Sequence, residues 1–250
     1  MSRRTVLALD LGTSGVRALV VGDDGAVRGR AWRALVTRYP APGHVEQDPE
    51  DWWAASRTVL GEALAQAGIS ARELAGIGLV TQRATAVAWE AGGRALAPAI
   101  GWQDTRTRPR VVALEAEGIP VTTMASATKL EWLWKTRPAL RAAAAAGRLR
   151  LGTPDAFLGD RLTGGAAFAT DPGQASVTGL WSLRSGDWHA GALARFGLER
   201  SWLPALAPTS AVLGETPAAL LGAPVPVAAR AGDQQAATFG QGAHAPGAAT

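Results

Sequence analysis

The chain has 250 residues, of which 47% are hydrophobic and 18% are charged, and it contains no cysteine. This length and composition allow a buried core and argue against a disordered chain, while the lack of cysteine excludes disulfides, thiolate metal sites and a cysteine nucleophile. The formal net charge is +4, but the cations are scattered and form no basic run, so we attribute them to a composition bias and expect no nucleic-acid partner.

The N-terminal segment has two arginines before an apolar run and superficially resembles a signal peptide. Asp10 interrupts this run, and the chain nowhere has 18 uninterrupted apolar residues. We therefore expect a soluble, cytoplasmic protein with no membrane partner. The three histidines are widely separated and lack the spacing of a zinc site, so any metal should be a hard cation held by carboxylates.

Residues 5–34 are expected to form three antiparallel strands, because three apolar runs are separated by the turn sequences GTSG and DDG. A long helix should follow, with Asp48 as its N-cap, Pro49 at its first position and an end at Gly68.

After this helix, the pattern predicts a buried strand over 74–82, a hairpin with a Gly-Gly turn over 84–96 and another strand over 97–105. Strands that alternate with helices indicate an α/β fold.

The middle of the chain is more helical, with helices expected over 106–118, over 127–148 with a break at Pro138, and over 152–165. From 165 to 230 the pattern loosens into turns and a proline-rich stretch that precedes a last apolar strand. This strand ends in AGDQQ, and the QAATFGQG that overlaps it should begin a helix at residue 235.

Two segments at strand ends could bind a phosphate or another ligand. In DLGTSGVR, a tight turn could present backbone N–H groups and hydroxyls to a phosphate, and Asp10 could hold a hydrated Mg²⁺; the alternative is an ordinary Gly-rich hairpin. In AGDQQ, Asp233 and Gln234 follow a strand at the edge where open α/β sheets bind ligands. The alternative there is that Asp233 only caps the next helix.

A third group suits polyol recognition. Arg83 can fork onto vicinal hydroxyls, Trp102 offers a flat apolar wall, and carboxylates and amides accept or donate hydroxyl hydrogen bonds. Taken singly, Trp102 is expected to be a core residue, and Asp104 with Arg106 a surface pair.

Together and in this order, these segments resemble the FGGY carbohydrate kinase family, and within it the glycerol kinases. The matching strings lie between residue 5 and about residue 247: DLGTSGVRALV, GHVEQDPEDWW, TQRATAVAWE, IGWQDTRT, SATKLEWLW, GTPDAFLGDRLTGG, ATDPGQASVTGLW and AGDQQAATFGQG. Eight ordered matches are far more specific than any one motif. The resemblance implies a ribonuclease-H-like α/β domain of the actin, Hsp70 and sugar kinase superfamily, with a mixed sheet flanked by helices. It also implies ATP-dependent phosphorylation of a primary hydroxyl of a small polyol or sugar.

The resemblance implies roles for individual residues. Asp233 is similar to the general base that accepts the hydroxyl proton, and Asp10 to the carboxylate that holds Mg²⁺. The positions that match polyol contacts are Arg83, Trp102, Asp233 and Gln234. Those in the segment that resembles the first ATP phosphate motif are Gly12, Thr13, Ser14 and Arg17.

Two departures from the glycerol kinase pattern bear on the substrate. Glycerol kinases have Glu after the arginine and Tyr in PYFSGTKL, where this chain has Ala84 and Met124. A triol would lose partners for its hydroxyls, at about 1–3 kcal/mol each. This counts against glycerol, and a larger or less polar polyol, or a ketose, could use the vacated space.

Members of the family continue into a second domain that holds the adenosine. Residues 1–250 are therefore expected to be the N-terminal, substrate-binding domain, inactive without the C-terminal ATP-binding domain. Two alternatives stay open: a catalytically incompetent sugar-binding or regulatory module derived from a kinase, and another actin-like ATPase that binds no sugar. The oligomeric state is also open, although kinases of this family often form homo-oligomers.

Overall fold

The computed structural model describes residues 5–243 and 245–248, and its centre is a mixed β-sheet. Over this described part, the sheet has six strands in the order β13-β14-β5-β1-β2-β3. Strand β5 is parallel to both β1 and β14, whereas β2, β3 and β13 run antiparallel to their neighbours. The bounds are β1 Thr5–Leu11, β2 Gly15–Gly22, β3 Val27–Ala34, β5 Leu74–Thr81, β13 Gly214–Glu215 and β14 Pro226–Gly232.

The three N-terminal strands confirm the expected pair of hairpins. Successive side chains of a strand point to opposite faces, which puts Leu7, Leu9 and Val20 in the core while Val6 on the other face is partly exposed. The buried strand expected over 74–82 is β5.

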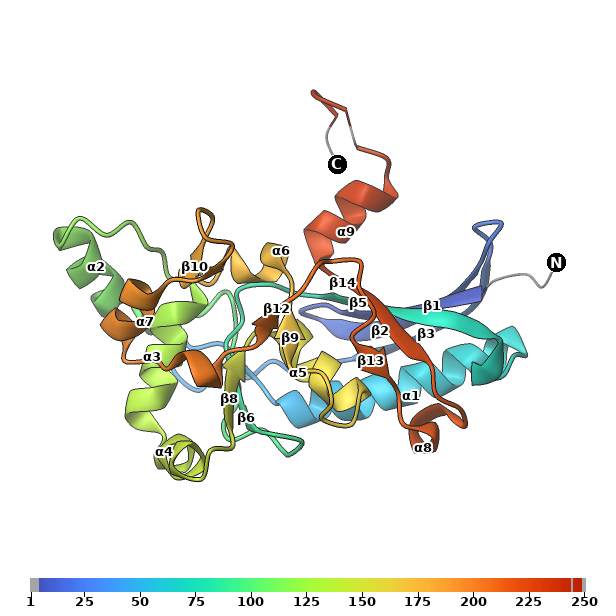
Figure 1. Cartoon of the computed structure of the whole chain (residues 1–250), viewed down its shortest axis with the longest axis horizontal. Helices are drawn as coiled ribbons and strands as arrows, with labels where there is room; N and C mark the ends of the chain where they lie inside the picture. The colour runs from blue at the N-terminus through green and yellow to red at the C-terminus, as the bar shows by residue number, and fades with distance from the viewer. Residues whose placement is uncertain (1–4, 244, 249–250) are drawn as a thin grey trace.

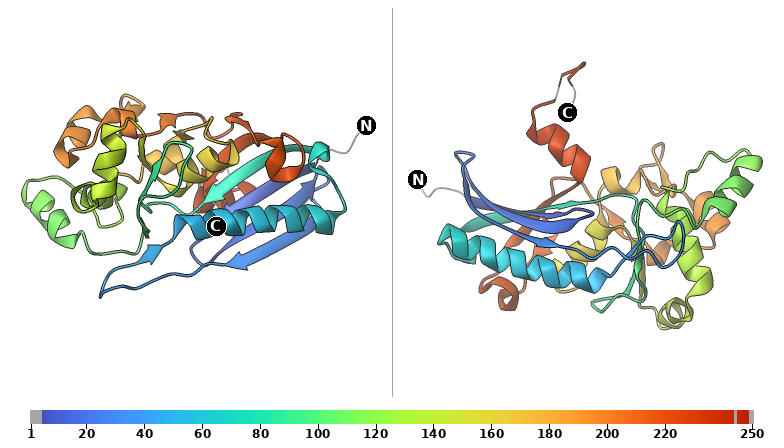
Figure 2. Two further views of the ribbon diagram at one scale, coloured as in Figure 1. Left: turned by 90° about the horizontal axis from the view of Figure 1, so that it is seen from below. Right: turned by 180° about the vertical axis from the view of Figure 1, so that it is seen from behind.

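Helix α1 (Pro49–Ala67) lies along one face of the sheet, against β2 and β3 (Figure 1; Figure 2, left). Its ends are those expected: Asp48 Oδ1 accepts the N–H of Glu50 at 3.0 Å, and Gly68 adopts a left-handed φ of 65°. Helix and sheet approach closely at Gly29, where a Cβ would overlap the carbonyl oxygen of Ala63.

The three helices between residues 108 and 145 pack beside the sheet around a second hydrophobic core, whereas the helix over 154–162 packs on the sheet and belongs to the first core (Figure 1). The predicted break at Pro138 is confirmed. The bounds are α2 Arg108–Ala116, α3 Ser126–Thr136, α4 Pro138–Ala145 and α5 Pro154–Leu162.

The region expected as a Gly-Gly hairpin differs from the prediction. Strand β6 (Val87–Glu90) pairs antiparallel with β8 (Leu149–Gly152), and the return arm of the turn makes only the isolated bridge between Trp89 and Ala95. Because β6 is buried, it takes a partner on each side, and the partner distant in sequence forms the longer ladder. The strand expected over 97–105 is reduced to β7 (Ala99–Ile100), paired with β4 (Glu46–Gln47).

Short elements connect these parts. They are β9 Ala169–Thr170, α6 Pro172–Ala175, β10 Trp181–Ser182, β11 Asp187–Trp188, α7 Ala190–Phe196, β12 Ala205–Leu206 and α8 Ala218–Leu221, with 3₁₀ turns at Ala71–Glu73 and Arg200–Trp202.

Helix α9 (Asp233–Gly240) follows β14 directly and projects away from the sheet (Figure 1; Figure 2, right). It begins two residues earlier than expected, so Asp233 lies in its first turn. Within the described ranges, no helix has the length and apolar character needed to cross a bilayer.

Candidate active site

The carboxyl ends of three parallel strands meet at one edge of the sheet. Thr81 at the end of β5 lies between Leu11 at the end of β1 and Gly232 at the end of β14. The segments that follow these strands therefore start side by side although they are distant in sequence. This is the edge at which open α/β sheets bind ligands.

A pocket at this edge gathers all four residues expected to contact a polyol. Its walls come from the turn after β1, the β5–β6 loop, the segment after β7, the segment before α3, the loop after α6 and the start of α9. The lining residues are Thr13, Gln82, Arg83, Ala84, Trp102, Met124, Val177, Asp233 and Gln234. Polar groups for hydroxyls thus face apolar groups for a carbon skeleton, as in other small-molecule sites.

A hydrogen-bond network supports one wall of the pocket. The indole N–H of Trp102 donates to Thr13 Oγ1 at 3.0 Å, and Thr13 Oγ1 donates to Gln82 Oε1 at 3.3 Å. Gln82 Nε2 in turn donates to Gln47 Oε1 at 3.0 Å, which also accepts the indole N–H of Trp52 at 3.1 Å. The buried side chain of Gln47 also donates to the carbonyl of Thr13 at 2.7 Å. The network therefore fixes the turn after β1 against the pocket.

Sequence patterns did not single out Gln82 or Val177 as pocket residues, nor Gln47 as their support. Each lies inside a string that matches the family, but no local pattern distinguishes it from its neighbours. Their position depends on how β4, β5 and α6 come together.

Arg83 lines the pocket and contacts two other segments. Its Nη1 donates to the carbonyl of Gly173 at 3.3 Å, and its Nη2 lies 3.5 Å from Gln234 Oε1. The side chain passes over Gly232, where a Cβ would overlap Arg83 Cδ. Glycine at 232 thus lets the guanidinium enter the pocket.

Asp233 is half-buried at the start of α9, and its Oδ1 accepts the N–H of Gln234 at 2.9 Å. The N-cap of α9 is Gly232, so the alternative that Asp233 itself caps the helix is wrong. A carboxylate in the first helical turn is stabilised by the helix dipole.

Asp10, near the end of β1, lies opposite Arg17 of β2. Burial raises the pKa of its carboxyl, the Arg17 guanidinium opposes this shift, and the charge of Asp233 adds to it. Asp10 and Asp233 are therefore close enough to interact electrostatically. Among the described residues there is no cluster of three or more His, Asp or Glu side chains suited to a metal. One or two carboxylates suffice for Mg²⁺, which usually keeps waters and phosphate oxygens as its other ligands.

The turn expected to bind phosphate is a tight hairpin. The N–H of Gly12 donates to the carbonyl of Gly15 at 3.0 Å, so it closes the turn itself. Ser14 is exposed at the tip, and Arg17 is exposed on β2 on the same side of the strands as Asp10. Thr13 lines the pocket, a position that the sequence did not indicate.

Two expected locations in the third group are wrong, although the expected pairing of Asp104 with Arg106 is confirmed. Trp102 is half-buried in the pocket wall, not in the core. Asp104 and Arg106 form a buried pair, with Nε 2.9 Å from Oδ1 and Nη2 2.7 Å from Oδ2, and Asp104 also accepts the N–H of Val45 at 2.6 Å. This pair holds the segment after β7, which carries Trp102.

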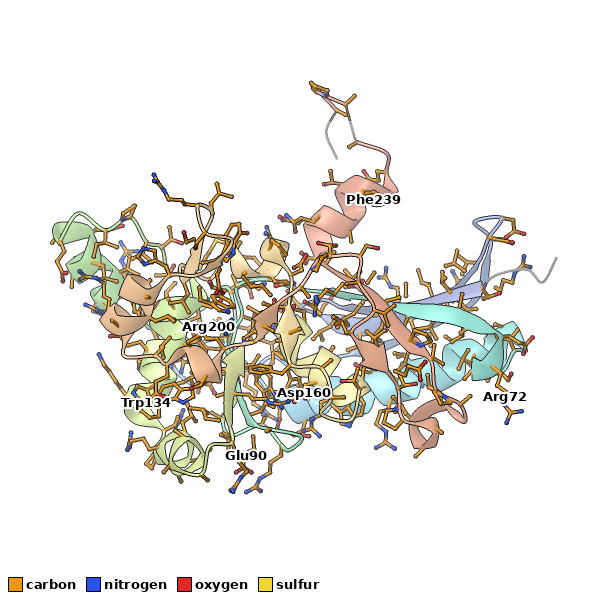
Figure 3. All side chains as sticks on the ribbon, in the orientation of Figure 1. Arg72, Glu90, Trp134, Asp160, Arg200 and Phe239 are labelled. Atoms are coloured by element: carbon orange, nitrogen blue, oxygen red, sulfur yellow. The ribbon has the colours of Figure 1, made fainter. Side chains whose placement is uncertain are left out.

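Another buried carboxylate, Asp160, is structural. It accepts the indole N–H of Trp89 at 2.7 Å and forms an ion pair with Arg150, in the interior and away from α9 (Figure 3). Its charge is thus satisfied within the fold.

The order and spacing of these segments match a known family. The model of the "FGGY family of carbohydrate kinases, N-terminal domain" matches residues 5–240. The chain belongs to this family. The resemblance inferred from the eight strings is confirmed.

The curated relatives of this FGGY domain include glycerol kinases. That of Bordetella pertussis is 45% identical over 255 residues, which cover 98% of this chain and 50% of the relative. The glycerol kinase of Aromatoleum aromaticum is 44% identical, and this chain covers 51% of its length. The chain thus spans about half the length of the curated relatives it matches.

Solved structures confirm the predicted α/β fold of the sugar kinase superfamily. Xylulose kinase from Rhodospirillum rubrum superposes with a TM-score of 0.87 at 30% identity, over 98% of this chain and 52% of that one. Glycerol kinase from Plasmodium falciparum, solved with ADP, gives a TM-score of 0.88 at 23% identity, over 96% and 50%. The second likeness concerns the fold alone.

Proposed function

We propose that this chain is the acceptor-binding half of a carbohydrate kinase that transfers the γ-phosphate of ATP to a primary hydroxyl of a small polyol or sugar. The observation that carries the proposal is the pocket itself. Three segments that are distant in sequence bring Arg83, Trp102 and Asp233 to one small site at the carboxyl edge of the sheet. The family and the glycerol kinase relatives support the same reaction.

In this proposal the acceptor lies against the indole of Trp102, while Arg83 and Gln234 bind its hydroxyls. An arginine can donate two parallel hydrogen bonds, and the amide of Gln234 can both donate and accept. The arrangement therefore fixes the orientation of the acceptor before any chemistry takes place.

Asp233 acts as the general base. The acceptor oxygen forms a bond to the γ-phosphorus while the bond from that phosphorus to the bridging oxygen of ADP breaks, and the hydroxyl proton passes to the Asp233 carboxylate. Phosphoryl transfer needs mainly positioning and charge neutralisation, so one carboxylate at the attacking oxygen suffices.

Asp10 would hold Mg²⁺, which when bound neutralises charge on the phosphates. A half-buried carboxyl whose pKa is raised by burial and by Asp233 fits this role, because a hard cation compensates both charges. Gly12, Thr13 and Ser14 of the turn, with Arg17 on β2, would face the phosphates. Thr13 would then contribute through its backbone, since its hydroxyl is already engaged with Trp102 and Gln82.

The adenosine would be held by a second domain. This part of the proposal is supported by the relatives, of which the chain covers about half. We also place the enzyme in the cytoplasm, where ATP is available.

The pocket favours an acceptor less polar or longer than glycerol. Ala84, Met124 and Val177 give it an apolar side. A hydroxyl directed at that side would lose hydrogen bonds worth about 1–3 kcal/mol, whereas a carbonyl or a carbon chain would lose less. A relative at 30% identity is a xylulose kinase, which supports a ketose.

The test is a kinase assay on the full-length enzyme that contains this chain, with ATP, Mg²⁺, and glycerol or xylulose as acceptor. Asp233→Asn should reduce kcat by roughly 100-fold or more while acceptor binding measured by calorimetry changes little. Asp23→Asn, in the exposed β2–β3 turn, makes the same charge change away from the pocket and should be neutral. An active Asp233→Asn enzyme would refute the base, and a wild type without ATP-dependent transfer to any polyol or sugar would refute the function.

A further inference from the structure

Lys129 is a buried lysine directly behind the acceptor pocket. It lies in the first turn of α3 and its side chain is wholly inaccessible to solvent. Lysine is rarely buried unless its ammonium is paired, because the charge loses its hydration. Within residues 5–243 and 245–248 no carboxylate lies within ion-pair distance of Lys129.

The partners of this ammonium are two backbone carbonyls. Lys129 Nζ donates to the oxygen of Ala84 at 2.9 Å and to that of Met124 at 3.3 Å. Burial lowers the pKa of Lys129 to about 7, while Asp104 partly opposes the shift and Arg106 adds to it. An amine has N–H donors whether it is protonated or neutral. Lys129 can therefore donate to both carbonyls at pH values below and above its pKa.

Both carbonyls belong to residues whose side chains line the pocket. Ala84 has a φ of 62°, a left-handed conformation that no other non-glycine residue adopts in the described part of the chain. This conformation costs a residue with a Cβ about 1–2 kcal/mol and persists only where the surroundings enforce it. The hydrogen bond from Lys129 to the Ala84 carbonyl is such a constraint.

The same turn carries Arg83, whose guanidinium enters the pocket. The ammonium therefore joins the turn of Arg83 and Ala84 to the segment of Met124, which precedes α3. Both segments contribute side chains to the pocket wall, so their separation affects the space available to an acceptor.

We infer that Lys129 is a positioning residue of the acceptor pocket: by binding the carbonyls of Ala84 and Met124 it holds the strained turn at residue 84 and sets the separation of the two wall segments. The inference rests on the proposed function. It assigns to Lys129 a role in acceptor affinity and selectivity, and no contact with the reacting atoms.

The alternative is a lysine that serves only the stability of α3. A structural role of that kind would lower the melting temperature when the ammonium is removed, but it would leave the kinetic constants of the folded enzyme unchanged. A positioning role changes the KM for the acceptor.

The test uses Lys129→Met in the full-length enzyme, because methionine keeps most of the length and removes the donors. The KM for glycerol or xylulose should rise roughly tenfold or more, with kcat and the KM for ATP within about threefold, since uniform binding of the acceptor is what is lost. Lys135→Met is the matched control on the same helix, where the side chain is 64% exposed. It should leave all constants unchanged.

A rescue variant distinguishes the turn from general stability. Glycine adopts positive φ without strain, so adding Ala84→Gly to Lys129→Met should recover a substantial part of the lost acceptor affinity. Lys129→Gln, which keeps an amide donor, should lie between wild type and Lys129→Met, and it serves if the methionine variant does not fold.

The outcomes distinguish a failure of the proposed function from a failure of the positioning role of Lys129. A wild type with no transferase activity contradicts the proposed function, and calorimetry with glycerol and xylulose then tests Lys129 through acceptor binding alone. An acceptor KM or Kd that stays at the wild-type value in folded Lys129 variants overturns the positioning role. The positioning role is also overturned if Ala84→Gly fails to recover the lost acceptor affinity. It is likewise overturned if the wild type binds neither glycerol nor xylulose.

Discussion

The indole N–H of Trp102 donates a 3.0 Å hydrogen bond to the hydroxyl of Thr13. This bond joins the wall of the acceptor pocket to the turn after β1, which we propose to face the phosphates of ATP. In the proposed site, the acceptor side and the phosphate side would thus share one hydrogen-bond network, which continues through Gln82 to the buried Gln47.

Thr13→Val removes the shared hydroxyl while it keeps the shape of the side chain. The indole N–H of Trp102 and Gln82 Oε1 then lose a partner, and each such loss costs about 1 kcal/mol. We expect the KM for the acceptor to rise roughly five- to tenfold and the KM for ATP to rise with it. The control is Thr58→Val on the exposed face of α1, which should change neither. A rise confined to one substrate would show that the two sides are independent.

Gly232→Ala tests the placement of Arg83. The added Cβ would overlap Arg83 Cδ, so the guanidinium must leave its place above β14. We expect acceptor affinity to fall about tenfold, the scale of one lost charge-assisted hydrogen bond. Gly61→Ala, in the interior of α1 with open space around it, is the control and should stabilise the chain by about 0.5–1 kcal/mol. Normal acceptor affinity in Gly232→Ala would contradict the role of Arg83.

Asp10→Asn should separate stability from function. Because burial and Asp233 raise the pKa of Asp10 in the folded chain, the native state favours the protonated carboxyl. Its contribution to stability is present below the ordinary value of 3.8 and is lost as the pH rises through the raised pKa. Asparagine does not ionise, so the variant does not lose this stability as the pH rises. It should melt at a higher temperature than the wild type at pH 7 and at a similar temperature near pH 3.

The same substitution should weaken the use of Mg²⁺. The concentration of Mg²⁺ needed for half-maximal activity should rise at least tenfold, the lower end of the roughly 10–100-fold cost of losing even an outer-shell partner. In the wild type, the affinity for Mg²⁺ should fall as the pH drops towards the raised pKa of Asp10. Asp23→Asn controls for net charge. An unchanged Mg²⁺ requirement in Asp10→Asn would remove Asp10 from the metal site.

Met124→Tyr tests the proposal that the pocket favours an acceptor other than glycerol. Met124 is 50% exposed at the pocket, so a tyrosine fits there without rearranging the core. A phenol at this position offers a hydroxyl partner, and we expect kcat/KM for glycerol to rise about fivefold relative to xylulose. Leu183→Tyr, at an exposed site in the β10–β11 turn, is the control. A selectivity that does not move would assign the preference to other residues.

Local sequence predicted much of the fold. The strands of residues 5–34, the ends of α1 at Asp48 and Gly68, and the break at Pro138 all follow from short-range rules of alternation, capping and proline geometry. The pairing of β6 with β8 did not, because a ladder between residues about 60 apart leaves no trace in the local pattern. The local pattern also does not show which distant segments cover Asp104 and Arg106. It therefore predicts a surface pair, whereas the structure buries both side chains.

The amino-acid sequence by itself determined the family, the absence of cysteine chemistry and the identity of Arg83, Trp102, Asp233 and Gln234 as pocket residues, since ordered motifs record these directly. Only the tertiary structure brought Thr13 into the acceptor pocket, placed Gln47 and Lys129 behind it and put Ala84 in a left-handed turn. The physical reason is burial: which polar groups must find partners depends on which chain segments exclude water from them, and distant segments decide that together.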